Sequence, residues 1–296
     1  MKLNNKLIQI KHQGKENRPY NLDDYNKVIS LRKKGFSYRK ISQQVNISTT
    51  TGQLWVKTSR KPRCLYAMKQ QKVLNNKSRK LTPCLAYIYG VLIGDGHLEK
   101  SKLSNRITLK VIDKEFALKF CKVLKEWSGF NPTWSEAYRI FNHKTKYGSL
   151  INCKSYFYTV RLGSKQAVDF ISKNIKCKTV DWDVPENIMQ TDDKDIIFAF
   201  LKGVFDSEGS AVYSQKYNKK RIELKMYGEN VKHLQYLLKK VGIESTVSQG
   251  KILKERNMYL LRILRKNSIK VFVKNIGFII ERKKDILSKI LNSYSV

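Results

Sequence analysis

Apolar residues recur at helical spacing in three short stretches near the start of the chain. The second stretch places Ile41 and Val45 on one face, and the third offers Leu54 and Trp55 as core residues. A tight turn precedes the third predicted helix. Three short helices with such a turn are typical of a helix-turn-helix module. We therefore expect a small all-α helix-turn-helix domain at residues 21–57.

From residue 82 onward the hydrophobic pattern occurs twice. Each copy predicts a helix, two strands, a helix, two strands and a helix, and one more helix closes the chain. The strand RITLK at 106–110 matches RIELK at 221–225. We therefore expect an α+β protein with two pseudo-symmetric αββαββα repeats and antiparallel sheets. The repeats occupy residues 82–190 and 191–296.

The first helix of each repeat carries small residues at four-residue spacing, which places them on one helix face. The first of these helices begins at a Thr82 cap with Pro83 at its first position, and the second begins near Thr191 or Asp192. Small residues on a shared face let two helix backbones approach closely. We therefore expect the two helices to pack against each other across a pseudo-twofold axis. Their small residues are Ala86, Gly90 and Gly94 in the first helix and Ala199, Gly203 and Ser207 in the second.

An acidic residue closes each of these two helices. Asp95 and Glu208 lie 113 residues apart, as do Gly90 and Gly203. A carboxylate at a helix C-terminus faces the negative end of the helix dipole, and two such carboxylates on touching helices repel each other. A divalent cation would reverse both effects, because Mg²⁺ favours carboxylate oxygens. The pair therefore predicts a site for Mg²⁺ or Mn²⁺, to which the carbonyl groups of Gly94 and Ser207 could add oxygens.

Two acids around a pseudo-twofold axis match a substrate that has its own local twofold symmetry, such as the two strands of a DNA duplex. The reaction that fits is phosphodiester hydrolysis, in which metal ions stabilise the attacking and leaving oxygens. Asp95 and Glu208 are the expected catalytic residues.

Polar residues alternate with apolar ones along the predicted strands, which predicts sheets with one apolar face and one basic face. Long polar side chains on such a face can reach base edges in the major groove. The expected DNA-contacting residues on the strands are Arg106, Thr108, Lys110, Arg161, Arg221, Glu223, Lys225 and Arg262. The third helix of the N-terminal domain is expected to offer Ser48, Thr49, Thr50, Thr51, Gln53 and Lys57 to a DNA groove.

Charge strengthens the case for a nucleic-acid partner. The chain has 59 Lys and Arg against 24 Asp and Glu, a formal net charge of +35, and such a surface favours a polyanion. No acidic residue occurs between Asp24 and Asp95. Residues 1–20 are expected to form an N-terminal arm and residues 58–81 a basic linker that can follow a phosphate backbone.

Other classes of protein fit the composition poorly. No apolar stretch approaches the length of a membrane span, and the first residues lack the apolar core of a signal peptide. The five cysteines are odd in number and none forms a C-x-x-C pair, which indicates reduced thiols in an intracellular protein. The four histidines are scattered and predict no zinc site.

The two motifs that carry the acids, YGVLIGDG and LKGVFDSEG, resemble the paired signature motifs of the LAGLIDADG homing endonucleases in their single-chain, two-repeat form. The resemblance covers about residues 82–296. It implies that the motif helices form the repeat interface, that Asp95 and Glu208 bind the catalytic metals, and that saddle-shaped four-stranded sheets lie over a long DNA site. It also implies cleavage that leaves cohesive 3′ ends, and genes that travel within introns or inteins.

The resemblance also implies supporting basic residues and shows one departure. Lys110 and Lys225 match the family's position at the end of the second strand, near the scissile phosphates. Lys283 matches a basic residue that follows the third helix of a repeat, and Lys178 is its weaker counterpart. The earlier acidic position of the motif is Asp206 in the second copy but Ile93 in the first, so that position is interpreted as structural.

Two other functions remain open. Some transcription regulators combine a helix-turn-helix with an endonuclease-like fold that has lost its active site, although both acids are retained here. Some members of the family are RNA-binding maturases that help a host intron fold, and a dual role with intron RNA is compatible with the sequence. Because both repeats lie in one chain, the protein is expected to be a monomer.

Overall fold

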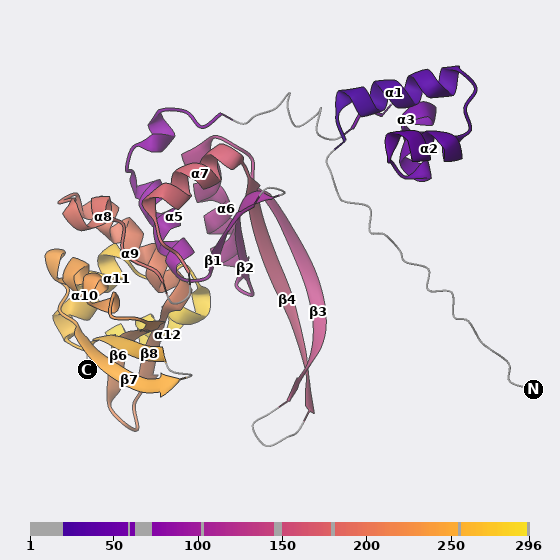
Figure 1. Cartoon of the computed structure of the whole chain (residues 1–296). Helices are drawn as coiled ribbons and strands as arrows, with labels where there is room; N and C mark the ends of the chain where they lie inside the picture. The colour runs from indigo at the N-terminus through magenta and orange to yellow at the C-terminus, as the bar shows by residue number, and fades with distance from the viewer. Residues whose placement is uncertain are drawn as a thin grey trace, which may run out of the picture. The chain divides into compact units, whose positions relative to one another are not determined.

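The computed structural model describes residues 20–58, 60–62, 73–101, 104–144, 150–178, 181–253 and 256–294. The chain forms two compact units, residues 1–71 and residues 72–296 (Figure 1). The second unit is called the body. Most of the predicted N-terminal arm lies outside the described residues, as do positions 59 and 63–72 of the predicted linker.

The N-terminal unit contains three short helices, α1 (Leu22–Lys33), α2 (Tyr38–Val45) and α3 (Thr49–Thr58). Helix α1 starts at a capping box in which Asn21 Oδ1 accepts from the Asp24 amide at 2.8 Å and Asp24 Oδ2 accepts from the Asn21 amide at 3.0 Å. These three helices match the predicted module.

The core of the N-terminal unit is small and is separate from that of the body. It consists of Val28, Ile41, Val45, Ile47 and Trp55. The expectation that Leu54 joins this core is wrong, because its side chain is 43% exposed while the neighbouring Trp55 is 4% exposed. Consecutive helix positions point about 100° apart, so one face of α3 cannot bury both side chains.

The body consists of two repeats with the same order of elements, which confirms the predicted fold class (Figure 1). Each repeat holds one antiparallel four-stranded sheet, with strand order β1-β2-β4-β3 in the first and β5-β6-β8-β7 in the second. The first repeat comprises α5 (Pro83–Ile93), β1 (Gly96–Lys100), β2 (Asn105–Val111), α6 (Lys114–Ser128), β3 (Thr133–Lys144), β4 (Leu150–Gly163) and α7 (Lys165–Asn174). The second comprises α9 (Lys194–Glu208), β5 (Gly209–Ser214), β6 (Lys219–Tyr227), α10 (Val231–Lys240), β7 (Thr246–Leu253), β8 (Arg256–Ile263) and α11 (Lys266–Asn275), and is followed by α12 (Glu281–Asn292).

The alternation along the strands buries one face of each sheet. On β2, Ile107 and Leu109 are fully buried under the helices while Lys110 between Leu109 and Val111 is exposed. On β6, Ile222 and Leu224 are buried in the same way. A strand turns successive side chains to opposite faces, so burial of one set leaves the polar set on the other face.

The motif helices begin at polar caps. The Thr82 hydroxyl accepts from the Leu85 amide, and Pro83 occupies the first turn of α5 as the sequence predicts. Helix α9 begins later than predicted, because Asp193 is its cap and accepts from the Asp195 and Ile196 amides at 2.9 and 3.3 Å.

Residues 73–80, which the sequence assigns to the linker, belong to the body and pack on its first repeat. Leu74 is 2% exposed and its amide donates to Gln166 Oε1 at 2.9 Å. Around the 3₁₀ turn η1 (Lys77–Arg79), the Ser78 hydroxyl donates to the Trp127 carbonyl at 2.7 Å, and the Trp127 indole donates to the Ser78 carbonyl at 2.8 Å. A short helix, α8 (Glu186–Gln190), precedes the second repeat and was not predicted.

Two remaining expectations concern cysteines and membranes. Cys84, Cys121 and Cys177 are free thiols in the described part of the chain. None of the described helices combines the length and the apolar character needed to cross a membrane.

Candidate active site

Helices α5 and α9 pack with their backbones in contact. A Cβ atom on Gly90 would lie 2.2 Å from a carbonyl oxygen of α9, and one on Gly203 would lie 2.4 Å from a carbonyl oxygen of α5. Farther along, a Cβ atom on Gly94 would lie 2.4 Å from the Cβ of Ser207. No side chain fits at these three glycines, so the small residues set the distance between the two helices. Ala86 is fully buried and packs in the same core.

The two acids lie where this helix pair ends. Glu208 is the last residue of α9, and Asp95 comes two residues after the end of α5. The ends of the two helices lie close together at Gly94, because a Cβ atom on this residue would lie 3.1 Å from Cγ of Glu208. Glu208 is half-buried, whereas Asp95 keeps an exposed surface.

The surroundings of both carboxyl groups disfavour their charged form. Burial raises the pKa of Glu208, and the negative charge of Asp95 raises it further. Partial loss of hydration raises the pKa of Asp95, Lys283 acts against this, and Asp113 adds to it. Within the described ranges, neither carboxylate makes a hydrogen bond or an ion pair. A cation between them would relieve both the repulsion and the lost hydration.

The donor set fits a hard divalent ion. No group of three or more His, Cys, Asp or Glu side chains that could hold a metal exists among the described residues. Mg²⁺ is usually bound through one or two carboxylates and completes its shell with waters and substrate phosphates. Asp95 and Glu208 could supply the carboxylates, with carbonyl oxygens of Gly94 and Ser207 nearby. A closed structural zinc site would need four protein ligands, which the described residues do not bring together.

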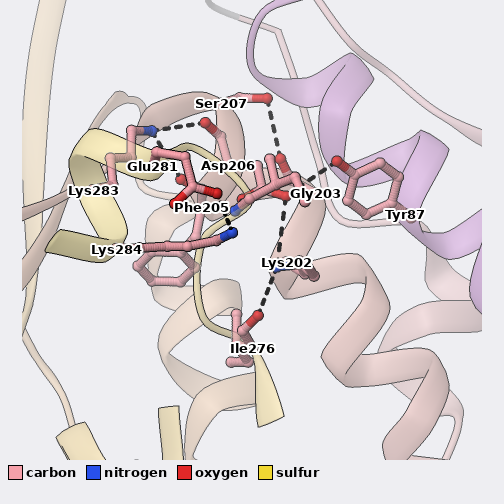
Figure 2. Close-up of polar contacts among 11 residues, drawn as sticks. Tyr87, Lys202, Gly203, Phe205, Asp206, Ser207, Ile276, Glu281, Lys283 and Lys284 are labelled. Atoms are coloured by element: carbon pink, nitrogen blue, oxygen red, sulfur yellow. Dashed lines mark hydrogen bonds and ion pairs between the residues drawn. The ribbon is translucent and has the colours of Figure 1, made fainter. Parts of the chain in front are cut away.

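Lys283 is buried beside the acids although it lies far from them in the sequence. It is 6% exposed, and its Nζ donates to the carbonyl oxygens of Asp206 at 2.7 Å and Phe205 at 3.4 Å (Figure 2). Burial lowers the pKa of Lys283 to about 8, against the opposing pull of Asp206 and Asp95. The start of α12 therefore brings a cation with a readily lost proton to the end of α9.

Asp206, the other acid of the second motif, is fully buried and engaged in hydrogen bonds. Its Oδ2 accepts from the Tyr87 hydroxyl at 3.1 Å, and Lys202 Nζ lies 3.8 Å away (Figure 2). Its Oδ1 accepts from the Ile279 amide at 2.7 Å. Burial raises the pKa of Asp206, while Lys202 and these hydrogen bonds oppose the rise. Asp206 joins α9 to α5 and to the loop before α12. Ile93, at the equivalent position of the first repeat, is a buried apolar residue.

A cavity of about 280 Å³ opens beside Asp95, and Lys110 and Lys283 both line it. The sequence reasoning missed two further residues in its wall, Asp113 and Arg282. Arg282 donates to both carboxylate oxygens of Asp113, at 3.0 and 2.9 Å, and so joins the second repeat to the first. Asp113 precedes α6 and looks like an ordinary helix cap in the sequence, so no local signal identifies this pairing.

A larger cavity, of about 700 Å³, opens beside Glu208. Its wall includes Gly94, His97, Lys178 and Lys225. Each acid therefore shares a cavity with the lysine of the second strand of its own repeat and with a lysine that follows the third helix of the other repeat. The two sides differ, because Lys178 is exposed whereas Lys283 is buried.

The predicted DNA-contacting residues of the strands lie on the sheet faces opposite the helices. Lys110 lies 4.9 Å from the centre of the Phe157 ring, and Arg161 lies directly across from Thr108. In the second repeat, Glu223 pairs across the strands with Arg262. The structure brings Lys110 and Lys225 to the acids and places the other polar residues farther out on the sheets.

The N-terminal unit carries its predicted contact residues on α3 and its first turn. Thr49, Thr50, Gln53 and Lys57 are exposed. Ser48 differs from these because its hydroxyl caps the helix, accepting from the Thr51 amide at 3.0 Å and lying 2.7 Å from the Thr51 hydroxyl. The exposed face of α3 is therefore carried by four of the six residues, and the other two stabilise the helix start.

Comparisons with known proteins found a matching family model and a relative of similar length. A family model described as LAGLIDADG-like domain matches residues 195–277. An uncharacterised protein of Methanocaldococcus jannaschii is 30% identical over 293 residues, which cover 92% of this chain and 94% of that protein. That likeness therefore extends well beyond the second repeat.

Similar folds occur among solved structures. One is the endonuclease I-DmoI in complex with DNA and Mn, at 18% identity and a TM-score of 0.42, covering 67% of this chain and 98% of that one. Another is full-length DUF199/WhiA from Thermotoga maritima, at 18% identity and a TM-score of 0.45, covering 76% of this chain and 63% of that one.

Proposed function

Because this chain belongs to the LAGLIDADG family, we propose that it is a site-specific endonuclease that hydrolyses both strands of a DNA duplex with divalent metal ions. The observation that carries the proposal is the pair of carboxyl groups at the ends of α5 and α9. Glu208 lies near the negative charge of Asp95, and both carboxyl groups have raised pKa values. Neither has a partner among the described residues, and each lies beside a cavity lined by lysines.

In this proposal Asp95 and Glu208 hold Mg²⁺ or Mn²⁺, together with carbonyl oxygens of Gly94 and Ser207. The ions would supply a nucleophilic water and would stabilise the attacking and leaving oxygens at the phosphate. The chain itself fixes the geometry, because the glycine contacts between α5 and α9 keep the two acids close.

The lysines of the two cavities stabilise the negative charge that develops on the phosphates. Lys110 and Lys225 approach from the second strand of each repeat, and Lys283 approaches from α12. Lys283 is held by two carbonyl oxygens, so its ammonium group is positioned before substrate arrives. A pKa of about 8 also lets it give or take a proton near neutral pH.

The polar sheet faces lie along the duplex, and the helix-turn-helix unit adds a second DNA contact through α3. One chain supplies both acids, so a monomer is complete, and sedimentation of a stable dimer without DNA would contradict this. By the family resemblance, the products are expected to carry cohesive 3′ ends.

The test is cleavage of a randomised DNA library with Mg²⁺ or Mn²⁺ by the wild type, Asp95→Asn and Glu208→Gln. We expect discrete double-strand breaks with the wild type and none with either variant. Glu186→Gln is the matched control, because it neutralises an exposed acid on α8. Tight DNA binding without fragments under either metal would overturn the nuclease proposal. A regulator that binds DNA without cutting it, or a maturase if intron RNA is bound instead, would then be the better account.

A further inference from the structure

Two arginines occupy equivalent places on the polar faces of the sheets. Arg106 starts the polar row of β2, and Arg221 occupies the same place on β6. The strand register confirms the match. Ile107, which follows Arg106, pairs with Leu162 near the end of β4, and Ile222, which follows Arg221, pairs with Ile263 at the end of β8.

A carboxylate holds each of these arginines through Nε. Arg106 Nε lies 2.7 Å from Glu99 Oε2 and donates to the Ser104 hydroxyl at 2.7 Å. Arg221 Nε donates to Glu223 Oε2, also at 2.7 Å. In the described part of the chain, the terminal nitrogens of both guanidinium groups make no hydrogen bond.

The two acids come from different places in the repeats. Glu99 lies on β1 directly across from Arg106, whereas Glu223 lies on the same strand as Arg221, two residues on. The residue opposite Arg221 is Val212, and the residue two after Arg106 is Thr108. A carboxylate at Nε therefore arises in two unrelated ways, as an ion pair from the neighbouring strand in the first repeat and as a hydrogen bond from the same strand in the second. This indicates a requirement on the arginine rather than a relic of duplication.

A carboxylate on this face is costly if the face only attracts phosphates. Glu223 is 8% exposed on the polar face of a chain whose net charge is +35, and its charge weakens binding to any polyanion. A bond at Nε, however, fixes the plane of the guanidinium and leaves the terminal nitrogens as a rigid fork. Such a fork matches the O6 and N7 acceptors of guanine in the major groove.

We propose that Arg106 and Arg221 each read one guanine, at equivalent positions of the two half-sites, and that Glu99 and Glu223 position them. The pseudo-twofold axis places the two guanines on opposite strands, at equal distances from the centre of the site. The DNA target therefore contains a symmetric G·C and C·G pair within an otherwise asymmetric sequence. This inference rests on the DNA binding in the proposed function but not on cleavage.

The test is selection of bound sequences from a randomised duplex library by the full chain in EDTA, with the wild type and variants compared. We expect the wild type to enrich one symmetric pair of guanines. Arg221→Lys keeps the charge but loses the fork, so the preference should fall about 10-fold or more at one guanine only. Arg106→Lys should do the same at the other guanine.

The carboxylates give the sharper readout. Glu223→Gln should weaken the guanine preference at the position that Arg221 reads, while binding to random DNA becomes tighter because a negative charge is removed. Glu99→Gln should do so on the other side. Asp169→Asn is the matched control, since it removes an acid of α7 whose partner is Lys100. This control should leave the selected sequence unchanged.

Each outcome decides a different claim. Selected DNA that lacks the symmetric guanines, or variants that alter other positions, would overturn this inference and leave DNA binding intact. Loss of preference in the arginine variants but unchanged preference in Glu99→Gln and Glu223→Gln would overturn the positioning role. Absence of DNA binding by the wild type would overturn the inference together with the proposed function. Thermal unfolding of each variant identifies any that fails to fold.

Discussion

Gly90→Ala should destabilise the body even though alanine favours a helix. The added methyl group would lie 2.2 Å from the Phe200 carbonyl oxygen, whereas ordinary contacts begin at 3.4 Å. Phe200 contributes a backbone atom, so no side chain can rotate away, and the two helices must separate. Overpacking of this kind costs about 2–3 kcal/mol. Alanine recovers about 1 kcal/mol of helix propensity relative to glycine.

The net loss is therefore about 1–2 kcal/mol. With a urea m-value of about 2 kcal/mol per molar, the midpoint should fall by about 0.5–1 M. Urea unfolding followed by tryptophan fluorescence measures this, since the body contains Trp127, Trp134 and Trp182. Gly163→Ala is the control, because its new Cβ meets nothing within 4 Å and should shift the midpoint little. If the urea midpoint of Gly90→Ala equals or exceeds that of the wild type, the close contact between α5 and α9 is refuted.

Four further substitutions change a charged residue of the site or the N-terminal core. The pKa of Lys283 is lowered to about 8 in the folded chain from 10.5, so the unfolded chain binds more protons between these values and stability should rise with pH there. The rise should approach about 3 kcal/mol in EDTA, and unfolding of Lys283→Met measured from pH 7 to 10 should lack it. Asp95→Asn should leave the melting temperature in EDTA equal or higher, because the raised pKa of this carboxyl means that folding disfavours its charge at neutral pH. Asp206→Ala should lower the melting temperature, with a loss of about 3–5 kcal/mol, since it removes the partner of the Tyr87 hydroxyl, of Lys202 and of the Ile279 amide. Equal effects of Asp95→Asn and Asp206→Ala would contradict the distinction between the two acids. Trp55→Ala should lower the unfolding free energy of the N-terminal unit by about 3–5 kcal/mol and leave the unfolding of the body unchanged. Calorimetry and circular dichroism, compared on the same variant, can check this.

Much of the fold is readable from local sequence pattern. Strand alternation around Ile107 and Ile222 and the helical spacing of apolar residues depend on geometry that repeats every two or 3.6 residues. The duplication then orders the elements, because two copies of one pattern imply two copies of one topology. The interface of α5 and α9 was predictable for a similar reason, since Gly90 and Gly203 are unfavourable inside helices unless another backbone lies against them.

Local sequence pattern does not predict which side chains are buried when burial depends on packing against other elements. Leu54 and Trp55 are both apolar, but only Trp55 packs between α1 and α2. Residues 73–80 look like linker because they are polar, yet Leu74 and the paired hydrogen bonds of Ser78 hold them on the first repeat. Helix propensity and charge do not predict such contacts, and the hydrogen bonds of Ser78 and Leu74 join residues 49 and 92 positions apart.

The sequence alone determined the topology, the close pair of motif helices and the position of Asp95 and Glu208 at their ends, because each follows from short-range spacing. The family resemblance implies Lys283 as a supporting residue and a structural role for Asp206, but only the tertiary structure decided their contacts, with Lys283 held at the end of α9 and Asp206 in a buried network. It alone paired Asp113 with Arg282 and set Glu99 and Glu223 against their arginines. Ionisable side chains are long, and where they end and how much water surrounds them depend on elements that only folding brings together.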